Sequence, residues 1–195
     1  MKIGVITITR DNNYGNKLQN YAVQRVLKLL GYESETIINT TNWNKNNKIK
    51  ASVKYLICII NNKILHSRFK VPYEWNRKIM FDKFTKKYLK ISKFYINETH
   101  IPQRLDKKYN YFVCGSDQIW NPEFKGTSSI DFLQFTKPSK RVAYAASFGV
   151  NKLPKKCLEK YKTWLKDFKL ITVRENTASD IIENLLGKKC EIVLD

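Results

Sequence analysis

The first forty residues carry the pattern that most limits what this chain can fold into. Residues 2–9 are mostly Ile, Val and Thr, which is typical of a buried strand. Between residues 17 and 30 the apolar side chains recur at helical spacing, and Gly31 follows where glycine commonly ends a helix. Residues 33–39 again have the composition of a strand. This order of elements predicts a βαβ unit, and hence an α/β fold with a mainly parallel sheet.

The rest of the chain continues this alternation of strands and helices. Further strands are expected at 109–114, 131–135, 141–147, 170–173 and 191–194. Further helices are expected at 52–65, 73–88, 154–168 and 176–186. The first two of these helices lie between two sheet-forming parts, so we expect a helical insertion at about 45–105 in one domain that spans residues 1–195.

A polar loop separates the first strand from the first helix. Asn12, Asn13 and Tyr14 offer hydrogen-bond donors and acceptors beside a helix N-terminus, and Gln19 belongs to the same motif. Loops that follow parallel strands bind ligands at the carboxyl edge of an α/β sheet, so we predict that these four residues contact substrate. The alternative is a capped turn in which the asparagines bond to nearby backbone.

A second polar loop, Gly-Ser-Asp-Gln-Ile-Trp-Asn-Pro at 115–122, follows another apolar run. Gly115 permits a sharp exit from the strand, Asp117 and Gln118 can hold sugar hydroxyls, and Trp120 can stack on a sugar face. The predicted substrate contacts in this loop are Ser116, Asp117, Gln118, Trp120 and Asn121. In the alternative interpretation Asp117 caps a helix and Trp120 belongs to the core.

Two further segments follow predicted strands. Arg174 lies at a strand end beside a helix start, where a cation suits a phosphate or carboxylate, although it can instead pair with a nearby acid as a structural contact. Residues 143–149 are mostly small and run into Gly149, which lets another part of the chain or a ligand approach closely. We favour the structural interpretation of that second segment.

The net charge of +19 is large, but its composition does not indicate a nucleic-acid site. Only seven of the 36 basic residues are arginines, the residue that nucleic-acid sites use most for bidentate contacts. We interpret the charge mainly as a lysine-rich surface. An anionic partner, such as a phosphorylated metabolite, an acidic glycan or a membrane surface contacted peripherally, is the alternative.

The four cysteines and two histidines show no metal-ligand spacing, so we expect no metal and no resident cofactor. Cysteines in apolar runs are typical of buried free thiols in a reducing compartment. The sequence shows no signal-peptide pattern and no apolar stretch near the ~20 residues that span a bilayer. We therefore expect a cytoplasmic protein.

Taken in order, five motifs resemble the polysaccharide pyruvyl transferase family. They are N-N-Y-G-x-x-L-Q-x-Y-A at 12–22, G-S-D-Q-x-W-N-P at 115–122, A-A-S-F-G at 145–149, V-R-E at 173–175 and V-L-D at 193–195. The resemblance runs from about residue 2 to 195 and is interrupted at about 45–105. It implies a fold like that of GT-B glycosyltransferases, with two Rossmann-like halves and the active site between them.

The resemblance also implies a reaction. Members transfer a pyruvyl group from the co-substrate phosphoenolpyruvate to two hydroxyls of a glycan or lipid-linked sugar, which gives a cyclic ketal. By this resemblance Arg174 is the donor-binding candidate. In the family V-L-D is followed by a second domain with the catalytic histidine, so we expect residues 1–195 to be an N-terminal half that needs a C-terminal half for catalysis.

Two other functions remain open from the sequence. A GT-B glycosyltransferase that uses a nucleotide sugar would bind a nucleotide, but the first loop has one glycine and no dinucleotide fingerprint. A non-catalytic domain that binds a glycan or a partner would bind its ligand without turnover.

Overall fold

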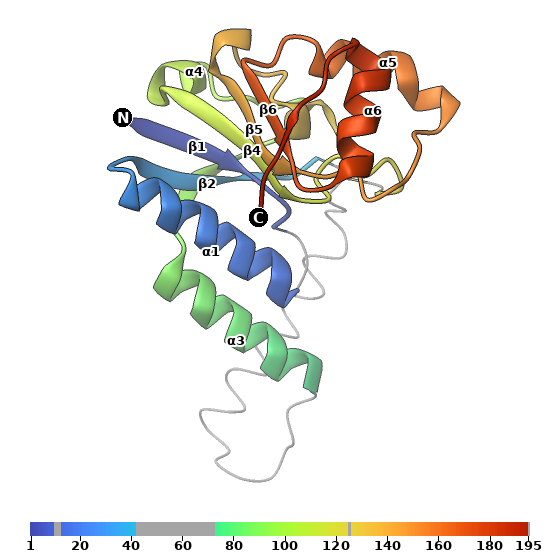
Figure 1. Ribbon diagram of the computed structural model, residues 1–195. Helices are drawn as coiled ribbons and strands as arrows, with labels where there is room; N and C mark the ends of the chain where they lie inside the picture. The colour runs from blue at the N-terminus through green and yellow to red at the C-terminus, as the bar shows by residue number, and fades with distance from the viewer. Residues whose placement is uncertain (10–12, 42–72, 125, 195) are drawn as a thin grey trace, which may run out of the picture.

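The computed structural model describes residues 1–9, 13–41, 73–124 and 126–194 (Figure 1). Seven strands form one sheet in the order β3-β2-β1-β4-β5-β6-β7, and every pair is parallel. The strands are β1 (Lys2–Ile6), β2 (Glu33–Asn39), β3 (Ile91–Ile96), β4 (Tyr111–Asp117), β5 (Arg141–Ala146), β6 (Leu170–Val173) and β7 (Glu191–Ile192). This arrangement confirms the expected α/β fold with a parallel sheet.

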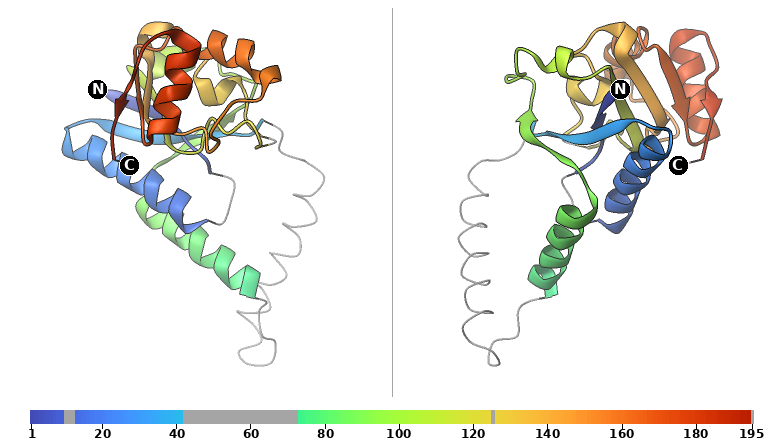
Figure 2. Two further views of the ribbon diagram at one scale, coloured as in Figure 1. Left: turned by 45° about the vertical axis from the view of Figure 1, so that its right-hand side comes forward. Right: turned by 90° about the vertical axis from the view of Figure 1, so that its left-hand side faces the viewer.

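Helices cover both faces of the sheet (Figures 1 and 2). The described helices are α1 (Tyr14–Leu29), α3 (Tyr73–Tyr88), α4 (Leu105–Lys108), α5 (Leu158–Leu165) and α6 (Asn176–Leu186), with 3-10 turns η1 (Ser129–Phe132), η2 (Pro138–Lys140) and η3 (Lys155–Cys157). Helix α1 packs beside α3 on one face, whereas α5 and α6 pack together on the other. Right-handed crossovers produce this division, because the chain moves outward from β1 in one direction and from β4 in the other.

Helix α1 begins three residues earlier than the apolar pattern predicts, because Asn13 caps it. The Asn13 side chain accepts a hydrogen bond from the Asn16 backbone N–H at 3.4 Å. At the other end Gly31 adopts a positive φ of 81°, as the sequence predicts for a helix stop. The strands on either side of α1 then pair in parallel, which completes the predicted βαβ unit.

The predicted helical insertion at about 45–105 is too long. Its described part contains the expected helix over Tyr73–Tyr88, but residues 91–96 form strand β3 at the edge of the sheet. An edge strand is half solvated, and only Ser92 and Ile96 are buried in β3, so the segment lacks a continuous apolar run. The helix expected at 52–65 lies outside the described residues.

Residues 131–135 do not form the predicted strand. Asp131 and Phe132 belong to the 3-10 turn η1, which a capping box between Ser128 and Asp131 begins, and Leu133 ends the turn in a left-handed conformation with φ of 54°. The apolar side chains of this segment are buried in the core rather than in the sheet. The helix predicted at 154–168 is also shorter, because η3 occupies its first turn and α5 spans only Leu158–Leu165.

An aromatic cluster fills the core beneath α5. The rings of Trp120 and Phe132 stack with centroids 5.5 Å apart, and Tyr161 packs against Phe132 at 4.9 Å. The Trp120 indole donates a hydrogen bond to the Asp131 carbonyl at 3.1 Å, and the Tyr161 hydroxyl donates one to the Trp120 carbonyl at 3.0 Å. These contacts fix the loop after β4 onto the sheet.

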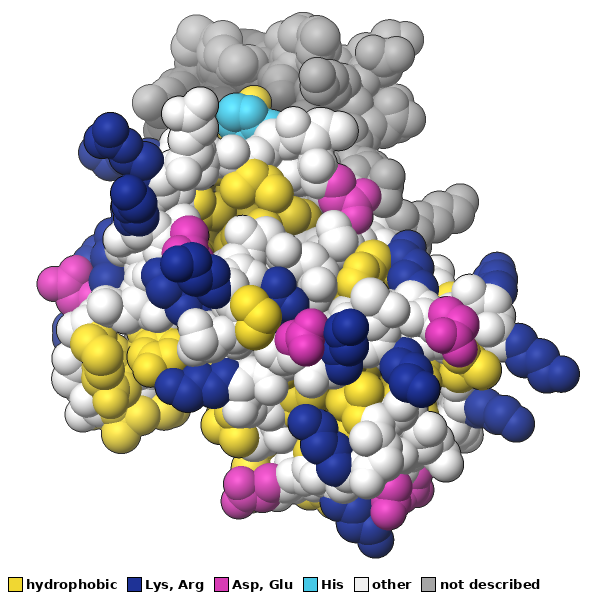
Figure 3. Space-filling view, turned by 90° about the horizontal axis from the view of Figure 1, so that it is seen from above, with side chains coloured by type: hydrophobic (Ala, Val, Ile, Leu, Met, Phe, Trp, Pro, Cys, Tyr) yellow, Lys and Arg dark blue, Asp and Glu magenta, His cyan; other side chains and the backbone are white. Residues whose placement is uncertain are grey.

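The basic residues do not gather into one patch on the face that Figure 3 shows. Lys and Arg side chains are scattered there with Asp and Glu side chains between them. This distribution favours the interpretation of a lysine-rich surface over that of a nucleic-acid site. Among the described helices, none combines the length and apolar character needed to cross a bilayer.

Candidate functional site at the carboxyl edge of the sheet

The two polar motifs leave neighbouring strands at the same edge of the sheet. Strands β1 and β4 are parallel and adjacent, with Ile6 opposite Cys114 in register. The sheet order changes direction between these strands, and α/β sheets bind ligands at the carboxyl edge of such a switch point. The predicted shared edge is therefore confirmed for the described residues, while Asn12 lies outside them.

A cavity of about 290 Å³ opens at this switch point, and we call it the edge cavity. It is lined from the ends of β1 and β2 and from the loop after β4. Its polar and aromatic lining includes Thr7, Thr9, Asn39, Glu123, Phe124 and Asp131. The described lining carries two carboxylates and no basic side chain, and Phe124 is 43% exposed. A polar cavity with one aromatic ring and hydrogen-bond acceptors suits a polyhydroxylated ligand.

A buried hydrogen-bond network holds the wall of the edge cavity. The Asn39 amide donates to the Asp131 carboxylate at 2.9 Å and to the Ser128 hydroxyl at 3.1 Å, and its oxygen accepts from the Thr41 N–H at 2.9 Å. The other Asp131 oxygen accepts from the Ser128 N–H at 2.8 Å. The network joins the end of β2 to a turn 92 residues later.

The sequence interpretation missed the residues that line the edge cavity. The segment Ser128-Ser129-Ile130-Asp131 carries a capping-box pattern, and this pattern is the signal that could have indicated a turn there. Phe124 carried no such signal, because an isolated aromatic residue in a loop is not distinctive.

The last residues of β4, just before its loop, have a strained backbone. Gly115 has φ of 124°, and a Cβ at this position would lie 2.2 Å from the Tyr144 carbonyl oxygen, so only glycine fits. The next residue, Ser116, has φ of 54° without being glycine. Such strained residues cluster at ligand sites, and here they stand at the carboxyl end of β4.

The two predicted motifs at 115–122 and 145–149 form one structural unit. The Ser147 N–H donates to the Asp117 carbonyl at 3.1 Å, and the Trp120 N–H donates to the Ser147 carbonyl at 3.1 Å. A Cβ at Gly149 would lie 2.5 Å from the Gln118 side chain. The small residues after β5 therefore allow close packing of the Gln118 loop, as the structural interpretation of that segment proposes.

The Trp120 ring is not exposed at the sheet edge, where the predicted stacking on a sugar would need it. Its side chain is fully buried in the aromatic cluster, so no ring face is available for a sugar. Ser116 and Asn121 are also almost fully buried, and the Asn121 amide donates to Gln118 at 3.0 Å. These three residues shape the loop, whereas Asp117 and Gln118 are half-buried at the edge and can still reach a ligand.

The described part of the first motif is placed on α1, outside the lining of the edge cavity. Asn13 caps the helix, and the exposed Tyr14 ring packs against Phe81 of α3 at 4.6 Å. Gln19 is half-buried further along the same helix. Neither these residues nor Asp117 and Gln118 line the edge cavity, although α1 begins at the same edge of the sheet and packs against β4.

Arg174 lies at the end of β6 on the same edge, two strands away from β4. In register, Ala146 is opposite both Asp117 of β4 and Val173 of β6. At the usual strand spacing the Cα atoms of Asp117 and Val173 are roughly 10 Å apart, and Arg174 follows Val173 directly. Its guanidinium Nε contacts the Glu175 carboxylate at 3.1 Å, and the side chain is half-buried. Arg174 is outside the edge cavity.

Two observations limit the chemistry of the described residues near the edge cavity. Burial, together with the charge of Asp131, raises the pKa of the Cys114 thiol well above its ordinary value, so this thiol is not a nucleophile. No group of three or more His, Cys, Asp and Glu side chains is arranged to hold a metal ion among the residues that the structure places.

The doubly wound parallel sheet, with a polar cavity at its switch point, defines a Rossmann-like domain. The sequence model of the family described as polysaccharide pyruvyl transferase matches residues 13–195. The chain therefore belongs to the polysaccharide pyruvyl transferase family, as its motifs indicate. A search of curated proteins and a search of solved structures found no match to it.

Proposed function

We propose that this protein takes part in the transfer of a pyruvyl group from phosphoenolpyruvate to two hydroxyls of a sugar in a cell-surface glycan, which forms a cyclic ketal. Membership of the family supports this proposal, and the edge cavity is the observation that carries it. The cavity lies at the switch point, where the fold presents loops from β1, β2 and β4 to one ligand.

In this proposal the edge cavity receives the acceptor sugar. The Glu123 and Asp131 carboxylates line it, and carboxylates accept hydrogen bonds from sugar hydroxyls. Phe124 is exposed at the same place and can lie against the apolar face of a sugar ring, the role that the sequence assigned to Trp120. The described lining has no basic residue, which favours a neutral ligand over a phosphorylated one.

The donor would then bind further along the same edge. Phosphoenolpyruvate carries a phosphate and a carboxylate, and these groups would be repelled by the acidic lining of the edge cavity. Arg174 supplies a cation at the end of β6, and Asp117 and Gln118 lie between it and the cavity. We propose that Arg174 exchanges its contact with Glu175 for the donor.

The bond changes in this proposal balance without a cofactor. A proton adds to the methylene carbon of phosphoenolpyruvate while a sugar hydroxyl adds to the central carbon. Phosphate leaves with the oxygen that it carried, and the second hydroxyl closes the ring on the same carbon. The two hydroxyl protons balance the added methyl proton and the proton on the released phosphate. The protein has to hold the two reactants within reacting distance, because correct positioning of two reactants lowers the barrier to their reaction.

We also propose that the reaction takes place in the cytoplasm. Cys114, Cys157 and Cys190 are free thiols, and free thiols persist in reducing compartments.

The test is to incubate the protein, alone and together with the C-terminal half that the family resemblance implies, with phosphoenolpyruvate and a panel of glycan acceptors, and to follow phosphate release together with the ketal methyl signal by NMR. Acceptor-dependent formation of both products supports pyruvyl transfer. Release of a nucleotide from nucleotide sugars, with no reaction of phosphoenolpyruvate, would instead show a glycosyltransferase. The variant that tests the edge cavity is Phe124→Ala, which should weaken acceptor binding while the fold is kept.

A further inference from the structure

The side of helix α1 that faces away from the sheet is apolar and exposed. Leu18, Val26 and Leu29 of this helix are exposed, and so is Leu30, the C-cap residue that follows it. Leu29 is 73% exposed and Leu30 is 63% exposed. Single exposed apolar residues are ordinary, but a row of them along one helix marks an interaction surface.

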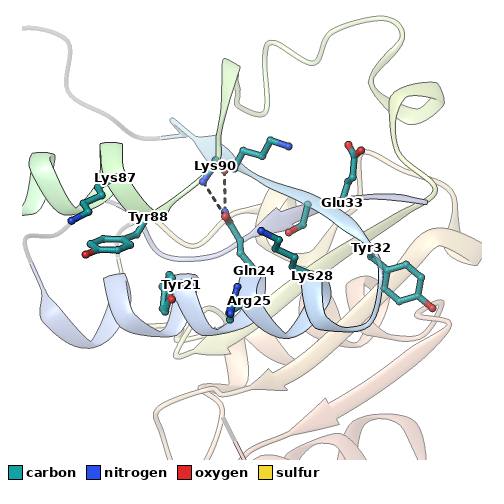
Figure 4. A pocket seen from close by; sticks show the side chains of 10 residues that line it. Tyr21, Gln24, Arg25, Lys28, Tyr32, Glu33, Lys87, Tyr88 and Lys90 are labelled. Atoms are coloured by element: carbon teal, nitrogen blue, oxygen red, sulfur yellow. Dashed lines mark hydrogen bonds between the residues drawn. The ribbon is translucent and has the colours of Figure 1, made fainter.

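The same helix also lines a cavity of about 510 Å³, and we call it the basic cavity (Figure 4). It is formed by α1, the end of α3 and the start of β2, at the opposite end of the strands from the edge cavity. Arg25, Lys28, Lys87 and Lys90 line it, with Glu33 as the one acid in the described lining. Within the part of the chain that the structure places, none of these four cations forms an ion pair.

The floor of the basic cavity is rigid. The buried Gln24 side chain donates to the Thr36 hydroxyl at 2.7 Å and to the Lys90 carbonyl at 3.0 Å, and it accepts from the Lys90 N–H at 2.9 Å. The Tyr21 and Tyr88 rings meet across the cavity at 5.9 Å. These contacts tie α1 to both β2 and the segment after α3, so the cations are displayed on a preformed surface.

Charge and apolar exposure together identify the partner. Helix α1 carries three cations, Lys17, Arg25 and Lys28, and no acidic residue. A second copy of the chain would present the same positive face and be repelled. An anionic lipid surface is complementary to both features, because its phosphate groups attract Lys and Arg while leucine side chains enter the boundary below the headgroups.

We propose that this α1 face docks the protein on an anionic membrane surface. The four cations of the basic cavity contact lipid phosphates, and Leu18, Val26, Leu29 and Leu30 enter the interface. The proposal concerns peripheral contact, and it does not depend on the activity at the edge cavity.

The experiment measures binding of the protein to vesicles by flotation at 0.15 M salt, where the screening length is about 8 Å. Neutral phosphatidylcholine vesicles are compared with vesicles that also contain phosphatidylserine. The test variant is Arg25→Gln/Lys28→Gln/Lys90→Gln. Its matched control is Lys152→Gln/Lys155→Gln/Lys156→Gln, which removes three exposed cations next to α5. Equal urea midpoints for both variants and the wild type show that the folds are kept.

We expect the wild type to bind only the anionic vesicles. The α1 variant should lose between about tenfold and 100-fold in partition coefficient, since each cation near the surface contributes about a factor of five. The control triple variant should lose less than about threefold, because its cations are distant from the docked face. Leu29→Ser should also weaken binding, whereas Leu170→Ser, which changes another exposed leucine, should not.

Three results would overturn the proposal. One is the absence of binding to anionic vesicles. A second is an equal loss in both triple variants, which would show that the net charge of +19 acts without a specific face. The third is saturable binding of inorganic phosphate or pyrophosphate at the basic cavity without vesicle binding, which would make it a site for a small anion.

Discussion

Gly149 packs directly on the side chain of Gln118, at a distance that leaves no room for a Cβ atom. A Cβ there would lie 2.5 Å from Gln118 and 2.7 Å from the Asn121 amide nitrogen. The two residues belong to separate motifs, one after β4 and one after β5, and both motifs are part of the carboxyl edge. Gly149 therefore fixes the position of the Gln118 side chain, which we place between the proposed acceptor and donor sites.

Gly149→Ala should destabilise the protein more than a positive φ alone explains. Gly149 has φ of 63°, which costs an alanine about 1–2 kcal/mol, and the clash with Gln118 adds to this cost. Gly187→Ala is the matched control, because Gly187 has φ of 70° with open space around it. Urea unfolding should show a loss about 1–3 kcal/mol larger for Gly149→Ala. Equal losses would contradict the packing described here.

Substitution of Trp120 should lower the stability of the protein, whereas substitution of Phe124 should lower its affinity for the acceptor. Trp120→Phe removes buried volume and the hydrogen bond to the Asp131 carbonyl, so we expect a loss of about 2–3 kcal/mol in unfolding free energy. Phe124→Ala changes an exposed ring and should alter stability by less than about 0.5 kcal/mol, yet weaken acceptor binding. Calorimetry of both variants measures this contrast, and acceptor affinity that is unchanged in Phe124→Ala would remove Phe124 from the site.

Asn39→Asp should be more damaging than its nearly identical shape suggests. The Asn39 amide donates to the Asp131 carboxylate at 2.9 Å, and the substitution replaces that donor with a second negative charge in a buried position. We expect a loss of about 3–5 kcal/mol at pH 7, measured by urea unfolding. Asn39→Ser, which keeps a short polar side chain without the charge, is the control and should cost less. A mild effect of Asn39→Asp would show that the network does not hold the cavity wall.

The Glu35 carboxylate should give the protein a distinct loss of stability in acid. Burial by itself would raise the pKa of Glu35, but hydrogen bonds from Lys2, Tyr109 and Lys108 lower it to about 2. The folded pKa is below the unfolded value, so this contribution is present above about pH 4.5 and is lost as the pH falls toward 2. The difference in unfolding free energy between wild type and Glu35→Gln should reach roughly 2–3 kcal/mol at pH 7 and shrink over that window. A difference independent of pH would contradict the ion-pair assignment.

The sequence predicts the fold well where the signal is local. The βαβ start follows from helical spacing that ends at Gly31, and strand β6 and helix α6 have the predicted bounds. The prediction fails where tertiary context decides. Strand β3 lies at the edge of the sheet, so its apolar residues do not form the continuous run that would distinguish a strand from the neighbouring helix. The segment at η1 resembles a strand in composition because its apolar side chains are buried in the core.

In the candidate site, too, local patterns in the sequence were predictive, whereas features set by tertiary contacts were not. Two motifs predicted the correct edge of the sheet, because every parallel strand ends there. The roles within the motifs were not predictable, since the burial of Trp120 depends on Phe132 and Tyr161 further along the chain. The pairing of Asn39 with Asp131 spans 92 residues and has no local signature.

The central claim, that the edge cavity binds the acceptor sugar, is tested most directly by residue-resolved NMR. Amide shifts of the isotope-labelled 23.0 kDa protein can be followed during titration with acceptor glycans and, separately, with phosphoenolpyruvate. The account predicts that glycan shifts concentrate at residues 7–9 and 123–131, and that phosphoenolpyruvate shifts concentrate around Arg174. Saturable glycan shifts located elsewhere, with residues 7–9 and 123–131 unchanged, would contradict it.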